Sequence, residues 1–340
     1  MLQRIPDTPP SIAPLPEGII RPYWSVMIPA YNCSVFLPDA IRSVLEQDPG
    51  EEVMQIEVVD DCSTDADVEA LVKSIGTGRV AYYRQEKNVG SLRNFETCIN
   101  RAKGYHVHLL HGDDRVKHGY YQQIQVLFTK YPEAGAAFCA WNNIDEENYI
   151  LRRSNIEVGR PELLVKWLPK LAEHTRIQYV AITVKRKAYE KLGTFYGVTY
   201  GEDWEMWARV ARDYPIAYTP EILAEYREHK SSISSNSFLT GKNIQDISKV
   251  INTITGYLPQ QDQKKINRLA HKNFMHWSFQ YTRDLWKQTG NTRFVYNQVK
   301  EILKVYVDSK LLIMLFIFGL WVSLDWFFLK FPKRLYHLIR

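Results

Sequence analysis

The chain has 340 residues, of which 45% are hydrophobic and 24% charged, so it is long enough to bury a sizeable core. Its 43 basic and 38 acidic residues give a net charge of +5, and no long basic block occurs in the first 300 residues, which argues against a nucleic-acid partner. The four cysteines form no Cys-x-x-Cys pair, so zinc or redox chemistry is not indicated and we expect reduced, cytosolic thiols.

Residues 1–22 contain six prolines and lack the apolar core of a secretory signal peptide. A segment of this composition is either a disordered tail or an arm packed along the next domain. We interpret it as an extended N-terminal arm.

Apolar segments and amphipathic segments alternate through the first half of the chain. Strands are expected at residues 24–32, 55–59, 105–110, 135–140 and 179–184. Helices are expected at 37–45 and 92–102, around 161–171, and from about residue 202 onward. This alternation favours an α/β sandwich with a parallel sheet over an all-α or all-β fold.

Two of the predicted strands end in adjacent carboxylates. One runs directly into Asp60 and Asp61, and another is followed shortly by Asp113 and Asp114. Ligands of open α/β sheets bind outside the carboxyl ends of the strands, and paired carboxylates there can hold a divalent cation together with a substrate phosphate. The simpler alternatives are an ordinary Gly-Asp-Asp turn and an acid that caps a helix start.

Five short motifs stand out in chain order. They are Ser-Val-Met-Ile-Pro-Ala-Tyr-Asn at 25–32, Val-Val-Asp-Asp-Cys-Ser-Thr-Asp at 58–65, Asn-Val-Gly-Ser-Leu-Arg-Asn at 88–94, His-Gly-Asp-Asp at 111–114 and Gly-Glu-Asp-Trp at 201–204. Over roughly residues 23–235 this series resembles family 2 glycosyltransferases. The resemblance implies a GT-A (Rossmann-like) nucleotide-diphospho-sugar transferase sandwich, a nucleotide-sugar donor, a divalent metal and inversion at the anomeric carbon. His111 departs from the family pattern, because many members carry there the first aspartate of an Asp-x-Asp triplet, and Cys62 replaces a commoner glycine.

The resemblance also implies which residues bind the donor. Asp60 or Asp61 would accept a hydrogen bond from the nucleobase, with Asp61 favoured and with Pro29 and Tyr31 framing the ring. Uridine is the favoured base, so a UDP-sugar is the favoured donor. Arg93 would contact phosphate or base as a fixed cation, and a solvated charge on a helix face is the alternative.

For the metal, the resemblance implies a set of three ligands. Asp113 and Asp114 would hold Mn²⁺ or Mg²⁺ against the diphosphate, with Asp114 on the metal and Asp113 on the ribose or a metal-bound water. Arg227 and His229 resemble an Arg-x-His element that closes over the diphosphate in many relatives. His229 would then be a further metal ligand, and an exposed loop histidine is the alternative.

Asp203 is the candidate catalytic base. Together with Glu202 it opens a predicted helix whose buried face is marked by Trp204, Trp207, Ala208 and Ala211. Acids favour helix N-termini through the macrodipole whatever their chemical role, but Glu-Asp-Trp also matches the base motif of the family. A carboxylate bonded to the acceptor hydroxyl would take its proton as the new bond forms.

Beyond a catalytic domain at 23–235, we expect a helical extension at 236–308 and an apolar, basic-tailed membrane-associating helix at 309–340. Residues 311–329 form a 19-residue apolar run followed by basic residues. The run is long enough to span a bilayer, but a single crossing would leave its basic tail outside a cytosolic enzyme. A helix in the interface at the cytoplasmic face of a membrane fits better, and a buried helix or an oligomer contact is the remaining alternative.

The sequence therefore predicts an inverting, metal-dependent glycosyltransferase of hexosyl or N-acetylhexosaminyl type in cell envelope polysaccharide biosynthesis. Its acceptor would be a hydroxyl of a glycan or lipid-linked molecule, and residues 141–178 either help to bind it or form a surface insertion. One alternative is a catalytically silent nucleotide-sugar-binding scaffold, because His111 replaces an acid. Another is a sugar-phosphate nucleotidyltransferase, although its glycine-rich triphosphate loop is missing.

Overall fold

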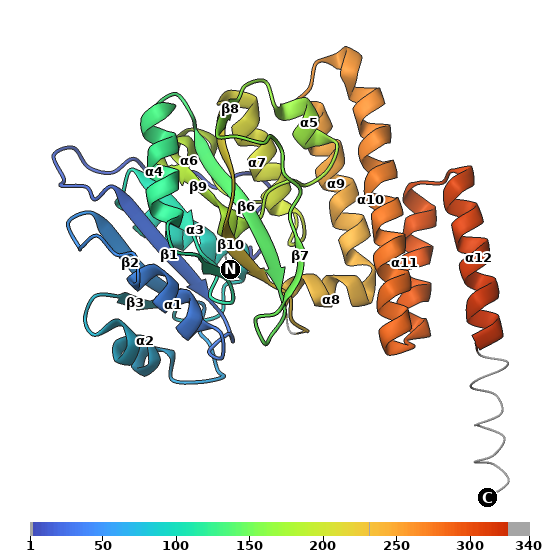
Figure 1. Ribbon diagram of the computed structural model, residues 1–340, viewed down its shortest axis with the longest axis horizontal. Coiled ribbons are helices and arrows are strands. Elements are labelled where there is room, and N and C mark those ends of the chain that lie inside the picture. The colour runs from blue at the N-terminus through green and yellow to red at the C-terminus, as the bar shows by residue number, and fades with distance from the viewer. Residues whose placement is uncertain (1–2, 231, 326–340) are drawn as a thin grey trace, which may run out of the picture.

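A mixed sheet of ten strands forms the centre of the chain in the computed structural model, which describes residues 3–230 and 232–325 (Figure 1). The strands are β1 (Trp24–Ala30), β2 (Met54–Asp60), β3 (Ala81–Arg84), β4 (His106–Leu109), β5 (Arg115–Val116), β6 (Ala136–Ile144), β7 (Ile150–Arg153), β8 (Glu162–Leu164), β9 (Ile182–Lys185) and β10 (Ile216–Arg227). Their order is β3-β2-β1-β4-β9-β6-β10-β5, with β7 paired to β6 and β8 to β10. Strands β1 to β4 are parallel to one another, as are β6 and β10, whereas β9 runs antiparallel between the two groups.

Helices cover both faces of this sheet. They are α1 (Leu37–Leu45), α2 (Val68–Gly76) and α4 (Tyr120–Lys130) on one face, and α3 (Ser91–Arg101), α6 (Arg186–Leu192) and α7 (Glu202–Asp213) on the other. Val26 and Ile28 of β1 contribute to the first of the two cores, and Met27 contributes to the second. All seven residues of β1 are buried, which explains its unbroken apolar sequence. The α/β sandwich predicted from the sequence is confirmed.

Two predicted elements differ in the structure. The single helix expected around 161–171 is instead β8 followed by the short helix α5 (Leu168–Ala172). Residues 162–164 pair antiparallel with β10, and this sheet pairing overrides their helical spacing. The strand expected at 179–184 begins with a 3₁₀ turn at Tyr179–Ala181, so only its second half joins the sheet as β9.

The N-terminal arm packs along the sandwich. Ile12 is 2% exposed within the core that also contains α3 and α7. The backbone N–H groups of Gly197 and Thr194 donate to Pro6 O at 2.8 Å and to Pro10 O at 3.0 Å. Over its described part, the arm is therefore ordered and not a loose tail.

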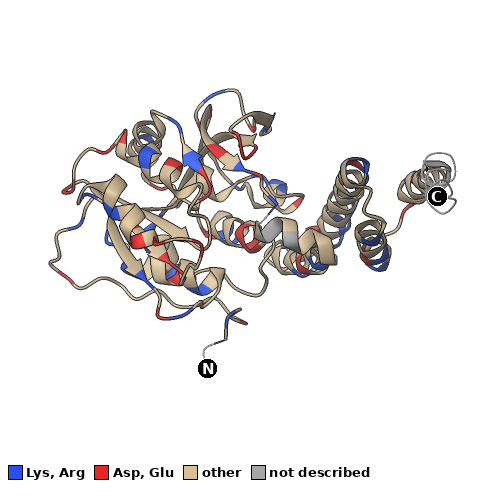
Figure 2. Cartoon of the chain, turned by 90° about the horizontal axis from the view of Figure 1, so that it is seen from below, with Lys and Arg blue, Asp and Glu red and all other residues tan. Residues whose placement is uncertain are grey.

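From residue 233 the chain forms a helical extension beside the sandwich (Figure 1). Its helices are α8 (Ile233–Thr240), α9 (Lys242–Gly256), α10 (Gln260–Thr289), α11 (Thr292–Val305) and α12 (Ser309–Asp325). Helix α9 packs on α7, and α10 packs on α9 and α5, so the extension shares a core with the sandwich. Basic and acidic residues are interspersed over both parts of the chain (Figure 2).

Helix α12 is buried on one side and exposed on the other. The ring of Phe318 lies 5.6 Å from that of Phe279 and 5.5 Å from that of Trp286, both on α10. Among the described side chains of α12, the exposed large apolar ones are Leu312, Ile313, Phe316, Ile317, Leu320 and Trp321. Within residues 3–230 and 232–325, no helix has the length and apolar character required to cross a membrane. Residues 326–340, which include the end of the predicted apolar run and the basic residues after it, lie outside the described residues.

Candidate active site

Loops that follow β1, β2 and β4 meet at the carboxyl edge of the sheet. The backbone N–H of Asp61 donates to Ala30 O at 2.8 Å, and that of Gly112 donates to Pro29 O at 3.1 Å. Because these three parallel strands are neighbours, the loops that carry the two acidic pairs lie side by side (Figure 1). This is the edge at which open α/β sheets bind ligands.

His111, Asp113 and Asp114 form a compact group of candidate metal ligands. One ligand atom from each lies within 4.8 Å of the others. Asp114 is 1% exposed. Its Oδ2 atom and His111 Nε2 are buried without a hydrogen-bond partner among the residues that the structure describes. Buried polar atoms are normally satisfied, so these two atoms suit a group that the chain itself does not supply.

Burial and mutual charge set the protonation of this group. Burial raises the pKa of Asp114, and the charge of Asp113 raises it further. Burial also opposes ionisation of Asp113, but the hydrogen bond from His229 and the nearby His111 outweigh it and lower the pKa of Asp113. Burial lowers the pKa of His111, so its imidazole is neutral near pH 7 and able to ligate a metal.

Arg227 fixes the loop that carries this acidic group. Its backbone N–H donates to Asp114 Oδ1 at 2.8 Å, and its Nε donates to Asp113 O at 2.9 Å. The terminal guanidinium nitrogens donate to Asp145 O, Asn148 Oδ1 and Asp39 Oδ2. The side chain is fully buried. The predicted contact of Arg227 with the donor diphosphate is therefore not available in this arrangement, because its donors are already used inside the protein.

His229 contacts the acidic group through Asp113. Its Nε2 atom lies 2.9 Å from Asp113 Oδ2, and its ring centroid lies 5.0 Å from that of Phe36. The side chain is 6% exposed, so it is not the freely exposed loop histidine considered as an alternative. The compact group of ligand atoms contains His111, the residue that departs from the family triplet, and His229 stands next to it.

Asp60 is fully buried and its hydrogen-bonding capacity is used by the fold. Its Oδ1 atom accepts from Ser63 N at 2.9 Å and Ser63 Oγ at 2.5 Å. Its Oδ2 atom accepts from Tyr82 OH at 2.8 Å and from Arg84 Nη1. A carboxylate has about four accepting positions, so Asp60 has none left for a nucleobase. Arg84, which no motif singled out, thereby joins the site through Asp60.

Asp61 organises the loop at residues 88–90. Its Oδ1 atom accepts from Val89 N at 2.7 Å, and its Oδ2 atom accepts from Gly90 N and Asn88 Nδ2, both at 2.9 Å. Burial raises the pKa of Asp61, and the two backbone donors oppose that rise. Three accepted bonds leave one accepting position on Oδ1, so Asp61 remains the candidate for nucleobase recognition.

The N-terminal arm reaches the same loop. Arg4 Nη1 donates to Asn88 O at 3.1 Å. Arg93 Nε donates to Gln3 O at 2.8 Å, and its Nη1 donates to Glu96 Oε2 at 2.6 Å. Arg93 therefore fastens the arm to α3 and, at 14% exposure, is not the solvated charge considered as an alternative.

Pro29 and Tyr31 differ in accessibility. Pro29 lies within the buried strand β1, and its carbonyl accepts the hydrogen bond from Gly112. Tyr31 follows the strand and is 51% exposed. The ring of Tyr31 is thus available to a ligand at this edge, whereas Pro29 is buried and contributes by holding the loop after β4 through its hydrogen bond with Gly112.

The first turn of α7 carries three acids, of which Glu202 and Asp203 line the active-site cavity and Glu205 pairs with Arg209. Gly201 precedes them with φ 86°, a left-handed conformation that favours glycine, and a Cβ atom there would lie 2.5 Å from Ile247. Burial raises the pKa of Asp203 to about 6 against the opposing backbone hydrogen bonds. Burial and the neighbouring Asp203 raise the pKa of Glu202 to about 8, and Tyr179 OH donates to Glu202 Oε1 at 3.2 Å. The pKa values of both carboxyls are therefore raised toward neutrality, which suits a carboxyl of this pair to accept a proton.

One cavity of about 260 Å³ brings these groups together. From the predicted site it contains Asp113 and Asp203, and it adds His111 and Glu202. The segment at 141–178 contributes Arg152, Thr175 and Gln178. The helical extension contributes Phe238, Ile247, Phe274, Trp277 and Tyr281. No motif marks the extension residues in the sequence, and only the fold brings them to the site.

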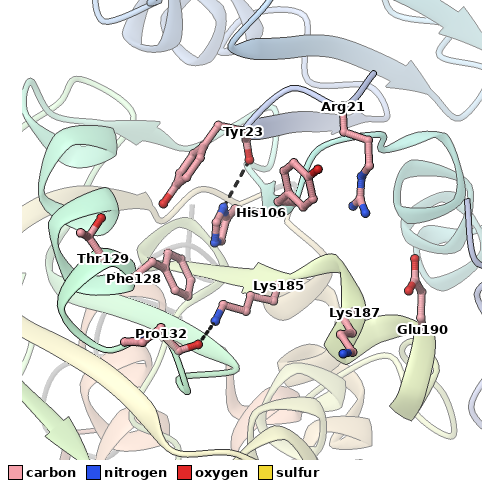
Figure 3. Close-up of a pocket in the computed structure, with 10 residues that line it drawn as sticks. Arg21, Tyr23, His106, Phe128, Thr129, Pro132, Lys185, Lys187 and Glu190 are labelled. Carbon is pink, nitrogen blue, oxygen red and sulfur yellow. Dashed lines mark hydrogen bonds between the residues drawn. The ribbon is translucent and has the colours of Figure 1, made fainter. Parts of the chain in front are cut away.

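A second cavity, of about 590 Å³, lies at the opposite edge of the sheet, where β1 and β4 begin (Figure 3). It is lined by Arg21, Tyr23, Tyr105, His106, Phe128, Thr129, Pro132, Lys185, Lys187 and Glu190. Arg21 Nε donates to Lys103 O at 2.9 Å, and its guanidinium lies 4.2 Å from the centre of the Tyr105 ring. Lys185 Nζ donates to the carbonyl of Pro132. This cavity has one acid, Glu190, and it lacks the paired carboxylates of the first.

Comparison with known proteins identifies the class of fold. Chain 1–349 of S. aureus TarS in complex with UDP-GlcNAc aligns with a TM-score of 0.63 at 14% identity, over 83% of this chain and 81% of that one. A second TarS 1–349 structure aligns with a TM-score of 0.59, also at 14% identity, over 83% and 80% of the two chains. The sandwich has the GT-A fold of nucleotide-diphospho-sugar transferases.

Sequence comparison identifies the family. Residues 25–193 match the sequence model of Glycosyl transferase family 2. TuaG of Bacillus subtilis strain 168, provisionally named a teichuronic acid biosynthesis glycosyltransferase, is 26% identical over 226 residues, or 65% of this chain and 85% of TuaG. An uncharacterized glycosyltransferase of Rickettsia typhi is 24% identical over 229 residues, or 65% of this chain and 69% of that protein. The chain belongs to glycosyltransferase family 2.

Proposed function

We propose that this glycosyltransferase inverts the anomeric centre as it moves a sugar from a nucleotide-diphosphate donor to an acceptor hydroxyl, with a divalent metal on the diphosphate. The observation that carries this proposal is the single cavity lined both by His111 and Asp113 of the acidic group and by Asp203. A transferase needs the leaving diphosphate neutralised at one end of the reacting bond and a base at the other. The cavity offers candidates for both.

The acidic group fits a divalent cation. Its donor set is two carboxylates and a neutral imidazole, and the partnerless Oδ2 of Asp114 and Nε2 of His111 leave it unsatisfied by the described chain. We assign Asp114, Asp113 and His111 as the residues that would hold Mn²⁺ or Mg²⁺, with His229 as a neighbour able to join them. When bound, such an ion supplies Lewis-acid stabilisation of the diphosphate.

Asp203 is the proposed base. Its pKa is raised to about 6, which is close to neutral pH. A general base is most effective when its pKa lies near the pH at which the enzyme works. Its carboxylate accepts a hydrogen bond from the acceptor hydroxyl and takes the proton as that oxygen bonds to the anomeric carbon. The carbon–diphosphate bond breaks on the opposite face, so the configuration inverts.

A UDP-sugar is the proposed donor. TarS has been crystallised with UDP and with UDP-GlcNAc, and this chain has its fold. Asp61 retains one accepting position at the edge where the exposed ring of Tyr31 lies. An acceptor of the uracil ring N–H beside an aromatic ring is the chemistry that uridine requires.

A ligand screen tests the donor and the metal together. We expect a UDP-sugar to raise the melting temperature only with Mn²⁺ or Mg²⁺ present, because a ligand selective for the native state stabilises it. Release of the sugar, to water or to an acceptor, should follow for the same donor. Donor binding without any sugar release would instead support the catalytically silent scaffold. Pyrophosphate release from a nucleotide triphosphate would support the nucleotidyltransferase.

We propose that the acceptor is a cell envelope glycan or lipid-linked molecule, and that the protein works at the cytoplasmic face of a membrane. The exposed apolar side of α12 suits the boundary of headgroups and acyl chains, and the basic residues 330–340 suit anionic lipid. The four cysteines are free thiols, which fits a reducing compartment.

Liposome flotation tests the membrane contact. The full chain should float with anionic vesicles, and a Phe316→Asp, Ile317→Asp double variant should float less, because both side chains are exposed on α12. A matched Leu239→Asp variant changes an exposed apolar residue on α8 and should float as the wild type does. Equal flotation of all three proteins would assign the contact to another surface.

A further inference from the structure

The wall of the active-site cavity that faces the extension is aromatic. Phe238 of α8 and Phe274, Trp277 and Tyr281 of α10 line the same cavity as Asp203. All four lie outside residues 25–193, the segment that matches the family. The extension is therefore part of the site as well as a support for the sandwich.

These side chains form an ordered aromatic cluster. The rings of Trp277 and Tyr281 are stacked, with centroids 5.5 Å apart and planes at 19°. Phe238 lies 4.5 Å from Tyr281, and Phe274 lies 5.5 Å from Trp277. Trp277 is nevertheless 41% exposed, whereas Phe274 and Phe238 are buried. The rings of Phe274 and Tyr281 pack against the indole of Trp277, while 41% of the Trp277 surface stays exposed.

Polar groups accompany this ring in the cavity. Arg152 and Glu228, both in the cavity lining, form an ion pair with one hydrogen bond of 3.1 Å from Arg152 Nη1 to Glu228 Oε2. Glu228 also accepts from Asn143 Nδ2 at 2.7 Å. An exposed indole and an ion pair that line the same cavity offer an apolar plane and hydrogen-bonding groups. This combination recognises a pyranose, whose C–H face packs on an aromatic ring while its hydroxyls bond to charged groups.

We propose that Trp277 and Tyr281, with the Arg152–Glu228 pair, form an acceptor subsite that binds a pyranose ring of the acceptor; this inference rests on the proposed transferase function. The base has to touch the acceptor hydroxyl, so the acceptor occupies the cavity that Asp203 lines. The loops assigned to the donor come from β1, β2 and β4 of the sandwich, and the aromatic cluster comes from the extension. The aromatic part of the acceptor subsite thus comes from helices that the family segment does not contain, whereas Arg152 comes from within that segment.

Trp277→Ala tests the subsite, with donor hydrolysis and transfer measured on the same preparation. The probes are the donor selected by the ligand screen and a panel of para-nitrophenyl hexopyranosides as acceptors. We expect the acceptor KM to rise roughly 3- to 10-fold, the range of one lost aromatic contact. Donor hydrolysis and UDP affinity should stay at the wild-type level, and Trp277→Phe should recover most of the acceptor affinity.

Two further variants separate the subsite from general damage. Trp321→Ala removes a tryptophan of similar exposure, 40%, on α12 and away from the cavity, so it should leave the acceptor KM unchanged. Arg152→Ala removes a half-exposed side chain and should also raise the acceptor KM without a loss of folding. An unchanged acceptor KM in both Trp277→Ala and Arg152→Ala would overturn the proposal, as would donor hydrolysis without transfer to any pyranoside. Absence of both hydrolysis and transfer would instead contradict the transferase function itself.

Discussion

The active-site cavity and the amino-end cavity lie at opposite ends of strands β1 and β4, and they differ in whether their charged groups already have partners. At the amino ends, Arg21 and Lys185 already donate to backbone carbonyls, and burial lowers the pKa of His106 to about 4, which keeps it neutral. At the carboxyl ends, Asp114 and His111 keep buried atoms without partners, and Asp203 has a pKa raised toward neutrality. Size alone would favour the amino-end cavity. Unsatisfied and perturbed groups mark the chemical site better than volume does.

The largest effect should come from Asp203→Asn. The change keeps the shape of the side chain but removes the basic oxygen, so transfer should fall about 10²- to 10⁴-fold while donor binding persists. Steady-state transfer kinetics and calorimetry with UDP measure the two quantities. Asp213→Asn is the control, because Asp213 ends the same helix in ion pairs with Arg212 and Lys191. Transfer within a few-fold of the wild type would place the base elsewhere.

Asp114→Asn should act on binding. The variant loses the charge of the proposed metal ligand, so metal-dependent UDP affinity should fall by more than the roughly 10- to 100-fold that supporting residues of metal sites contribute. Calorimetric titration with Mn²⁺ measures this loss. Affinity measured without metal should be equal in the variant and the wild type. Undiminished metal-dependent affinity in the folded variant would remove Asp114 from the metal site.

The pH profile should show which carboxyl works as the base. Asp203 accepts a proton only when ionised, and its pKa is raised to about 6, so kcat/KM should fall as the pH decreases through about 6. The titratable groups around it are Glu202 on the same helix, Tyr179, Tyr200 and, from α9, Asp246. The tyrosines have pKa values raised by burial and stay neutral in this range.

Glu202→Gln sharpens that assignment. The variant removes the other carboxyl of the helix start that lines the cavity but leaves Asp203, so the acid limb of the profile should remain. If kcat/KM of the variant became independent of pH between about 5 and 7, the group whose titration controls activity would be Glu202 and not Asp203.

The smallest effect should come from the opposite cavity. Lys187 is exposed and lines the amino-end cavity but not the active-site cavity. Lys187→Ala should therefore leave transfer, donor affinity and the pH profile unchanged. The same assays measure all three. A loss of transfer would mean that the two ends of the strands are functionally coupled, and the contrast between the cavities would fail.

The sequence was most informative where local chemistry sets position. Apolar strands that end in acids predicted the carboxyl-edge loops, since parallel strands place their ends together. The start of α7 was also predictable, because Gly201 and the buried tryptophans after it mark a helix boundary. These features depend on a few consecutive residues.

The sequence was least informative where partners lie far apart along the chain. Arg93 and Arg227 have the right residue type to bind phosphate, yet the Nε of Arg93 donates to Gln3 and the Nε of Arg227 donates to Asp113. Residues 162–164 follow a helical pattern, but they pair antiparallel with the edge of β10 and therefore form a strand. Trp277 joins the site only through the packing of α10, which no local pattern encodes.

The N-terminal arm has a consequence for synthesis on the ribosome. The side chain of Arg4 cannot donate its hydrogen bond to Asn88 O until Asn88 has been synthesised. The carbonyl of Pro6 cannot accept from Gly197 N until Gly197 has been synthesised. At about 5–20 residues per second, the interval between the synthesis of Pro6 and that of Gly197 lasts roughly 10–40 s. The loop at 88–90, which Asp61 organises, can bond to Arg4 as soon as Asn88 has been made, well before Gly197 can bond to Pro6. The arm therefore completes its contacts with the sandwich only after Gly197 has been made.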